Sequence, residues 1–185
     1  KINPNLQKAL VENGLTQANE MQIETFSTIK SGADAVIQSP KGTGKTTTIV
    51  LNVIQRLERT VGESTRALIM VESKEKVLEM EELFLKYANY HDLSILGVHD
   101  KGDIDYDKNI TSLGLDILIG TPNRINALFS SAGFNASTIR MFVVDDAAAA
   151  IRDYATKGYD IVIAHGSQYG SSLQEIAPDF PKTVF

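Results

Sequence analysis

Residues 36–48, VIQSPKGTGKTTT, combine closely spaced glycines with a lysine and several hydroxyl side chains. Gly42 and Gly44 let the backbone curl so that successive N–H groups face inward, where they and the start of a following helix can hold phosphate oxygens. Lys45 would supply a point charge to β- and γ-phosphates, and the Thr46 hydroxyl is a ligand type for magnesium. We therefore predict a site for ATP or ADP with Mg²⁺, with these nucleotide-binding residues: Lys41, Gly42, Thr43, Gly44, Lys45, Thr46 and Thr47.

This loop departs at one position from the strict phosphate-binding pattern G-x-x-x-x-G-K-[ST], because Ser39 stands where the pattern has glycine. The order of strand, loop and helix that we predict around the loop still agrees with the pattern. A glycine-rich structural turn is the alternative interpretation of the same residues.

A second polar group, Asp145 and Asp146, follows the apolar run MFVV at residues 141–144. P-loop enzymes keep a magnesium-orienting carboxylate at the end of such a strand, so we predict that Asp145 and Thr46 bind the metal. The alternative is that Asp145 is the N-cap of an alanine-rich helix, where its carboxylate would accept backbone N–H bonds. The candidate catalytic residues are Lys45, Asp145 and Asp146.

Short apolar runs bounded by turn residues predict the strands that would position these side chains. They lie at residues 35–37, 67–71, 94–98, 117–119, 141–144, 160–164 and 183–185. Between them, residues 45–59 and 74–88 have the apolar stripes typical of helices. This alternation predicts right-handed βαβ units and an α/β fold, a three-layer α/β/α sandwich with a mainly parallel sheet. Ligands of such sheets bind at the carboxyl ends of the strands.

The composition fits one soluble globular domain over residues 1–185, with 43% apolar and 22% charged residues. The net charge of −5 argues against a surface that grips nucleic acid by bulk electrostatics. The absence of cysteine excludes disulfides and thiolate metal sites. We find no apolar run long enough to span a bilayer and no N-terminal signal, so we expect no membrane partner. Because the chain begins at Lys1 and ends within an apolar run, we expect an excised piece.

Four segments together resemble the N-terminal RecA-like domain of DEAD-box RNA helicases, in order and in spacing. They are GLTQANEMQ (14–22), SPKGTGKT (39–46), TPNR (121–124) and VVDD (143–146), and the resemblance covers about residues 2–146. It implies that Gln22 hydrogen-bonds to the adenine edge, although Leu15 and Ala18 stand where the family usually has Phe and Pro. The aromatic residue that stacks on adenine in the family would precede Lys1.

The same resemblance implies contacts with RNA. The segment VESKEKV (71–77) is similar to the family motif P-T-R-E-L-A, with Ser73 and Lys74 at the Thr and Arg positions, and TPNR is similar to T-P-G-R. From the residues alone, hydroxyls and cations that follow strands can position a phosphate backbone, but Thr-Pro is also an ordinary helix start and Lys74 an ordinary solvated residue. The predicted nucleic-acid residues are Ser73, Lys74, Thr121 and Arg124.

Two departures from the family motif point to weak catalysis. Where the family has the Glu that positions the attacking water, this chain has Asp146, whose side chain is one methylene shorter. A displacement of about a bond length can lower a rate by about 10²-fold. Ala148 replaces the Asp that couples the nucleotide to the rest of the helicase. The resemblance also implies that part of the charge stabilisation comes from arginines on a second RecA-like domain, which we do not expect within residues 1–185.

Residues 149–185 are similar instead to a segment of the basic membrane protein family of substrate-binding lipoproteins, which bind nucleosides for transporters. KGYDIVIAHG, QYG and EIAPDFP are the segments in common, in the order helix, strand, helix, strand. We hypothesise an engineered or recombined chimera joined near Asp145–Ala147, with a helicase-like part over 1–146 and a periplasmic-binding-protein-like segment over 147–185. A divergent helicase domain is the alternative. The first part would be cytoplasmic, whereas the tail resembles an exported protein without its signal.

Three functions follow as hypotheses. The first is a nucleotide-binding module with little or no hydrolysis and no unwinding on its own. The second is a weak, RNA-binding ATPase fragment of a natural helicase, and the third is a folded scaffold without enzymatic activity. The sequence therefore leaves open whether the chain is an enzyme.

Overall fold

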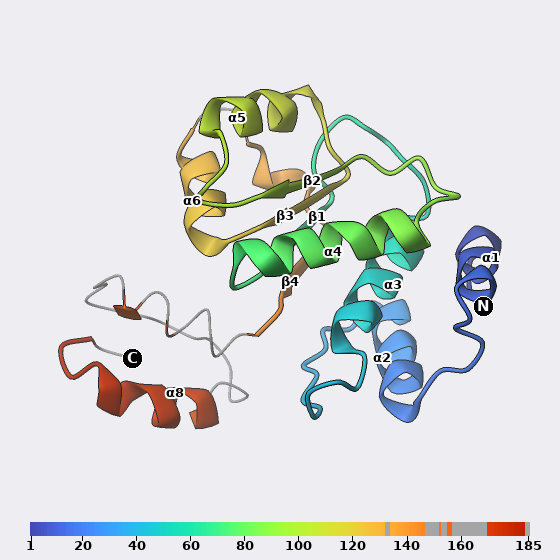
Figure 1. Cartoon of the computed structure of the whole chain (residues 1–185), viewed down its shortest axis with the longest axis horizontal. Helices are drawn as coiled ribbons and strands as arrows, with labels where there is room; N and C mark the ends of the chain where they lie inside the picture. The colour runs from blue at the N-terminus through green and yellow to red at the C-terminus, as the bar shows by residue number, and fades with distance from the viewer. Residues whose placement is uncertain (132–133, 147–151, 153–154, 157–169, 184–185) are drawn as a thin grey trace. The chain divides into compact units, whose positions relative to one another are not determined.

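The computed structural model describes residues 1–131, 134–146, 152, 155–156 and 170–183. The chain divides into two compact units, Lys1–Val143 and Val144–Phe185, which we treat separately. The first unit is an α/β domain of the RecA-like type, as predicted (Figure 1).

The first unit begins with helices α1 (Pro4–Glu12), α2 (Glu20–Lys30) and α3 (Lys45–Leu57). Strand β1 (Ala67–Met70), helix α4 (Lys74–Tyr87), strand β2 (Ile95–Val98) and helix α5 (Ile104–Leu113) follow. Strand β3 (Ile117–Gly120), helix α6 (Pro122–Ser130) and the 3₁₀ turn η1 (Ala136–Thr138) lead to strand β4 (Met141–Val144). The strands lie in the order β2-β3-β1-β4, and β1 and β2 both pair parallel to β3.

Alternate residues of the central strands pack on opposite faces of the sheet, which is the period of two expected for strands. Ala67 and Ile69 of β1 contact the core beneath α1, α3 and α4, whereas Leu68 packs with residues of α6 and β3 on the other face. Figure 1 shows α3 and α4 on one side of the sheet and α5 and α6 on the other. The sheet is therefore the middle layer of a three-layer α/β/α sandwich.

The predicted strand at residues 35–37 is wrong: this segment has no regular secondary structure. Val36 is 65% exposed and only Ile37 is half-buried, so the apolar run is not inside the sheet. A run of three apolar residues buries little surface to offset the entropy of ordering a strand. Of the other predictions, strand 160–164 and residues 184–185 lie outside the described residues, while Thr183 is in a bend.

A buried carboxylate ties together the loops at the amino ends of the strands. Asp116, immediately before β3, has no exposed side-chain surface and pairs with Arg66 at 2.7 Å. Its oxygens also accept hydrogen bonds from Thr60 Oγ1 (2.7 Å), Val61 N (3.0 Å) and Ser94 N (2.9 Å). Burial by itself raises the pKa of this carboxyl, but these hydrogen bonds outweigh it and lower the pKa to about 2.

This shift predicts a loss of stability in acid. Because the folded-state pKa is below the ordinary value of 3.8, the ionised Asp116 stabilises the fold above that value, and the contribution is lost as the pH falls towards 2. Its size is about 2 kcal/mol. Denaturant unfolding measured between pH 7 and pH 2 should show this decline, and an Asp116→Asn variant should lack that part of it. An equal decline in the variant would contradict the assignment.

The second unit contains helix α8 (Gly170–Ile176) and the 3₁₀ turn η3 (Ala177–Asp179). Helix α8 agrees with the second helix in the order helix, strand, helix, strand expected for residues 149–185. Ala155 and Ile176 are buried, and Arg152 donates a hydrogen bond to Asp179 at 2.6 Å. The run Ala147–Ala150, including Ala148, lies outside the described residues.

Candidate functional site

The loop before α3 has the backbone that its glycines predict. Gly42 and Gly44 adopt φ of +83° and +86°, a region that L side chains rarely enter. Gly44 is the N-cap of α3, and no side chain caps the first turn of this helix. A Cβ atom at Gly44 would also stand 3.3 Å from Gln22 Nε2. Within the part of the chain that the structure describes, the amides at the start of α3 therefore have no side-chain cap, which is the arrangement that binds phosphate at helix N-termini.

Ser39 has a specific part in closing this loop. The Thr43 hydroxyl donates to the Pro40 carbonyl at 2.7 Å and lies 2.5 Å from the Ser39 hydroxyl. Since the single hydroxyl hydrogen of Thr43 is used for Pro40, Ser39 is the donor to Thr43. The residue that departs from the strict pattern thus joins the start of the loop to Thr43.

The two residues with the sharpest predicted roles, Lys45 and Thr46, each hold a protein partner. Lys45 Nζ donates to the Ser39 carbonyl oxygen at 2.6 Å. Thr46 Oγ1 accepts a hydrogen bond from Lys76 Nζ at 2.9 Å. Lys41 is exposed, and Thr47 is half-buried beside Thr46 on α3. The Lys45 ammonium therefore contacts a carbonyl oxygen of the loop. The Lys76 ammonium, which comes from α4, contacts a hydroxyl oxygen of the loop.

Sequence reasoning missed Lys76. It lies in VESKEKV, the segment compared with P-T-R-E-L-A, at the position where that motif has leucine. A lysine where the motif has an apolar residue was the available signal, but only its contact with Thr46 shows why it matters.

Gln22 belongs to α2 and is fixed by the start of that helix. The Gln22 side chain accepts from Asn19 N at 3.1 Å, and the Asn19 side chain accepts from Gln22 N at 2.9 Å, which forms a capping box. Asn19 Nδ2 also donates to the Thr43 carbonyl at 3.0 Å. The first turn of α2 is thereby joined to the phosphate loop.

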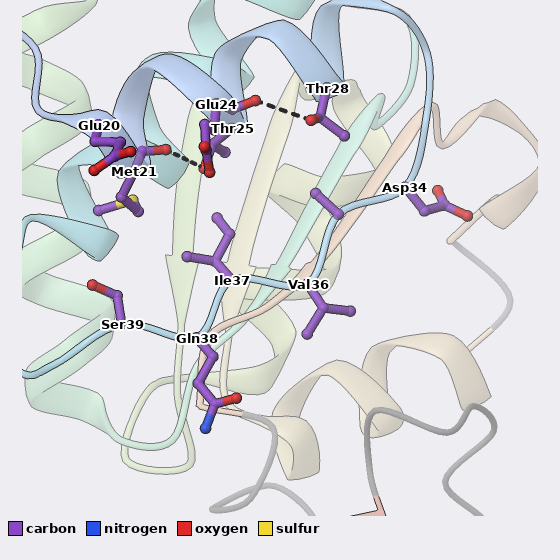
Figure 2. A pocket seen from close by; sticks show the side chains of 11 residues that line it. Glu20, Met21, Glu24, Thr25, Thr28, Asp34, Val36, Ile37, Gln38 and Ser39 are labelled. Carbon is purple, nitrogen blue, oxygen red and sulfur yellow. Dashed lines mark hydrogen bonds between the residues drawn. The ribbon is translucent and has the colours of Figure 1, made fainter.

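A pocket of about 470 Å³ lies between α2 and the segment before the loop. Figure 2 shows Ile37 on the side of the segment towards Met21 and Thr25, while Val36 points away. Ser39 belongs to the pocket and to the loop. The lining residues are Glu20, Met21, Glu24, Thr25, Thr28, Asp34, Ala35, Val36, Ile37, Gln38 and Ser39.

The predicted nucleic-acid residues follow β1 and β3, at the carboxyl edge of the sheet. Ser73 is the N-cap of α4 and accepts from Lys76 N at 3.2 Å, and Lys74 beside it is half-buried. Thr121, the residue before α6, is buried and lies 3.4 Å from an Asp100 carboxylate oxygen. These positions agree with the edge expected from the sequence, and RNA contact by Ser73, Lys74 and Thr121 stays a prediction.

Arg124 is buried, with an exposed fraction of 8%. Its guanidinium donates to an Asp107 carboxylate oxygen at 3.0 Å and to the carbonyls of Asp100 (3.3 Å) and Gly102 (2.9 Å). Burial raises the pKa of Asp107, and the nearby Arg124 charge opposes part of that rise. The side chain thus joins α6 to α5 and the turn before it, and RNA contact by Arg124 stays a prediction.

Asp145 and Asp146 follow β4 directly and belong to the second unit. Asp145 is half-buried, while Asp146 is exposed and adopts a φ of +59°. Asp tolerates this left-handed conformation better than most residues with side chains. Among the described residues, no three His, Asp or Glu side chains are grouped to hold a metal.

A parallel α/β sheet whose carboxyl edge bears a glycine-rich loop opening a helix defines the P-loop class of RecA-like domains. A profile of the DEAD/DEAH box helicase family matches residues 19–168 of this sequence. The chain belongs to the DEAD/DEAH box helicase family.

Curated relatives agree with this assignment. The chain is 27% identical over 150 residues to "ATP-dependent RNA helicase eIF4A" of Meyerozyma guilliermondii, which covers 79% of the chain and 37% of the relative. The corresponding protein of Debaryomyces hansenii is 28% identical, with 79% and 36% covered. "ATP-dependent RNA helicase SUB2" of Chaetomium globosum is 28% identical, with 78% and 34% covered. The chain thus spans about a third of the length of these relatives. Among the residues described by the structure, no helix is long and apolar enough to cross a membrane.

Proposed function

We propose that the chain binds ATP or ADP with Mg²⁺ at the loop of residues 39–47, hydrolyses ATP slowly or not at all, and does not unwind RNA by itself. The observation that supports this most is the start of α3, where the glycine-dependent loop presents amides without side-chain caps next to Lys45. Backbone N–H groups and a lysine ammonium complement phosphate oxygens in charge and geometry.

The loop residues take separate roles in this proposal. The amides of residues 41–44 and 46–47 hold phosphate oxygens, and Lys45 moves from the Ser39 carbonyl to the β- and γ-phosphates. Gln22 supplies the contact with the base, because its side-chain amide nitrogen lies close to Gly44 of the loop. The capping box of Asn19 and Gln22 fixes this side chain at the start of α2. The adjoining pocket between α2 and residues 34–39 gives the base or ribose room beside Ser39.

Mg²⁺ is part of this proposal, with Thr46 and Asp145 as its protein ligands. The Thr46 hydroxyl oxygen accepts a hydrogen bond from the Lys76 ammonium, so it already faces a positive charge in the protein. Hydroxyl and carboxylate oxygens are the hard ligands that this metal prefers. When bound, Mg²⁺ would supply positive charge that offsets the negative charge of the phosphates. The role of Asp145 rests on its position after β4 and on the family resemblance.

In this proposal hydrolysis is slow because Asp146 stands in place of the water-positioning Glu. Unwinding requires a second RecA-like domain as a partner, as the family resemblance implies. A cytoplasmic setting, where ATP and RNA are available, belongs to the same proposal. We also treat residues 1–185 as one domain for function, with the helicase-like part over 1–146 and the tail over 147–185.

Calorimetric titration with ADP and Mg²⁺ tests the site. Lys45→Ala should weaken ADP binding at least about tenfold, because a hydrogen bond to a charged group is lost. Arg56→Ala is the matched control, since it removes an exposed positive charge about 16 Å further along the same helix. Equal affinities of wild type and Lys45→Ala would contradict the proposed role. Absence of binding by the wild type would leave only a scaffold function.

The second candidate is an RNA-binding, weakly active ATPase fragment of a natural helicase. It is favoured by the location of Ser73, Lys74 and Thr121 after β1 and β3, and by relatives that are named RNA helicases. Stimulation of ATP turnover by single-stranded RNA would support this candidate, and an unchanged turnover would argue for the binding module.

A mixed origin of the chain is a separate proposal. It is supported by the resemblance of residues 149–185 to the lipoprotein family and by the boundary of compact units between Val143 and Val144. The family match through residue 168 supports instead one continuous helicase domain. Mapping the coding sequence onto parent genes decides between them, because a single natural gene continuous across residue 146 would exclude a chimera.

A further inference from the structure

Lys76 lies in the first turn of α4 with its ammonium directed at the phosphate loop. Its Nζ is 2.9 Å from Thr46 Oγ1 and 3.3 Å from a Glu79 carboxylate oxygen, and its side chain is 24% exposed. The neighbouring Val77 is fully buried in the core shared by α3 and α4. The packing of Val77 fixes the orientation of the helix turn that carries Lys76.

The electrostatic setting of Lys76 is unusual for a lysine. The amino end of a helix carries partial positive charge, which favours acidic side chains and disfavours cations. Lys76 lies in the first turn of α4 and contacts the first turn of α3, so its charge adds to two positive helix ends and to Lys45. Glu79 and Glu75, which lies in the same turn, offset part of this charge. The contact of Lys76 with Thr46 nevertheless places an ammonium directly beside the loop at which phosphate is proposed to bind.

We propose that Lys76 is a second phosphate-binding lysine. Without metal, its ammonium occupies the place at Thr46 where Mg²⁺ would bind, and it contacts the terminal phosphate of the nucleotide. This inference rests on the proposed nucleotide site at residues 39–47. The Lys76 ammonium and Mg²⁺ are both cations and repel each other at one oxygen, so binding of Mg²⁺ at Thr46 favours displacement of Lys76 from Thr46 Oγ1. Nucleotide binding by this chain therefore depends less on Mg²⁺ than it would with an uncharged residue at position 76.

The test compares ADP affinities measured by calorimetry in excess Mg²⁺ and in excess EDTA. Lys76→Met should weaken ADP binding in EDTA by about tenfold, the effect of one lost charge-assisted hydrogen bond, and should change the affinity in Mg²⁺ much less. The dissociation constant in EDTA divided by that in Mg²⁺ is therefore about tenfold higher for Lys76→Met than for the wild type. Lys76→Arg, which keeps the charge, should restore most of the affinity in EDTA.

Lys86→Met is the matched control, because Lys86 lies on the same helix about 15 Å from Lys76. The ratio of dissociation constants of this variant should equal that of the wild type. Thermal melting of Lys76→Met verifies that the variant is folded. If the wild type binds ADP and Lys76→Met has an unchanged ratio, Lys76 has no role in phosphate binding and the inference is wrong. If the wild type binds no ADP in either buffer, the proposed nucleotide site itself fails.

Discussion

Replacing Asp116 by alanine should lower the free energy of unfolding by about 3–5 kcal/mol, the range expected when one partner of a buried ion pair is removed. The carboxylate is completely buried and pairs with Arg66, whose guanidinium would be left without its main anion. The backbone N–H groups of Val61 and Ser94 would also lose their acceptor. A loss of this size is a large fraction of the stability of an ordinary domain.

Urea unfolding at pH 7 measures this change. Asp105→Ala is a suitable comparison, because this substitution removes the same charge at an exposed position. The expected change in its free energy of unfolding is about 0.5 kcal/mol. A loss below about 1 kcal/mol for Asp116→Ala would mean that the contacts of Asp116 contribute little, whatever their geometry. Nucleotide affinity measured below the unfolding transition should be unchanged, because Asp116 lies at the amino ends of the strands, away from the loop.

The second large effect is expected at Asp146. Under the proposed function, Asp146→Glu should raise the single-turnover rate of ATP hydrolysis by about 10²-fold, because the longer side chain brings a carboxylate to the position of the attacking water. Asp146→Asn, which removes the charge without changing the length, should not exceed the wild-type rate. ADP affinity should be similar in all three proteins.

The backbone at residue 146 gives this experiment a structural check. Its φ of +59° suits Asp better than Glu, so Asp146→Glu should also melt at a slightly lower temperature than the wild type. A folded Asp146→Glu protein that binds ATP but hydrolyses it no faster would show that the side-chain length at residue 146 does not limit catalysis. The family resemblance then points to arginines of a second RecA-like domain, and adding such a domain to the reaction would test their contribution.

The sheet was predictable where apolar residues form runs that are buried on both faces. Residues 67–70, 95–98, 117–120 and 141–144 are strands within one residue of the predicted limits. Residues 35–37 have the same apolar character but remain largely exposed, because an apolar run indicates only that a segment can be buried. Whether it pairs with a strand depends on neighbours that the run itself does not specify.

The site was predictable where the backbone requires a particular residue and unpredictable where packing chooses a partner. The positive φ of Gly42 and Gly44 agrees with the curled backbone that their spacing indicates. The bond from Lys76 to Thr46 joins residues 30 positions apart and exists only because α3 packs on α4. The burial of Arg124 against Asp107 likewise depends on how α5 and α6 meet.

The bonds that Lys45 makes with the Ser39 carbonyl and Lys76 makes with Thr46 also bear on how fast a nucleotide associates. Under the proposed function, Lys45 moves from the Ser39 carbonyl to the phosphates and Mg²⁺ displaces Lys76 from Thr46, so both ammonium groups change partners when a nucleotide with Mg²⁺ binds. Association that needs such a rearrangement is slower than encounter by diffusion. The observed association rate should therefore level off at high nucleotide concentration. The limiting rate is the rate at which the hydrogen bonds of these two lysines to the loop break.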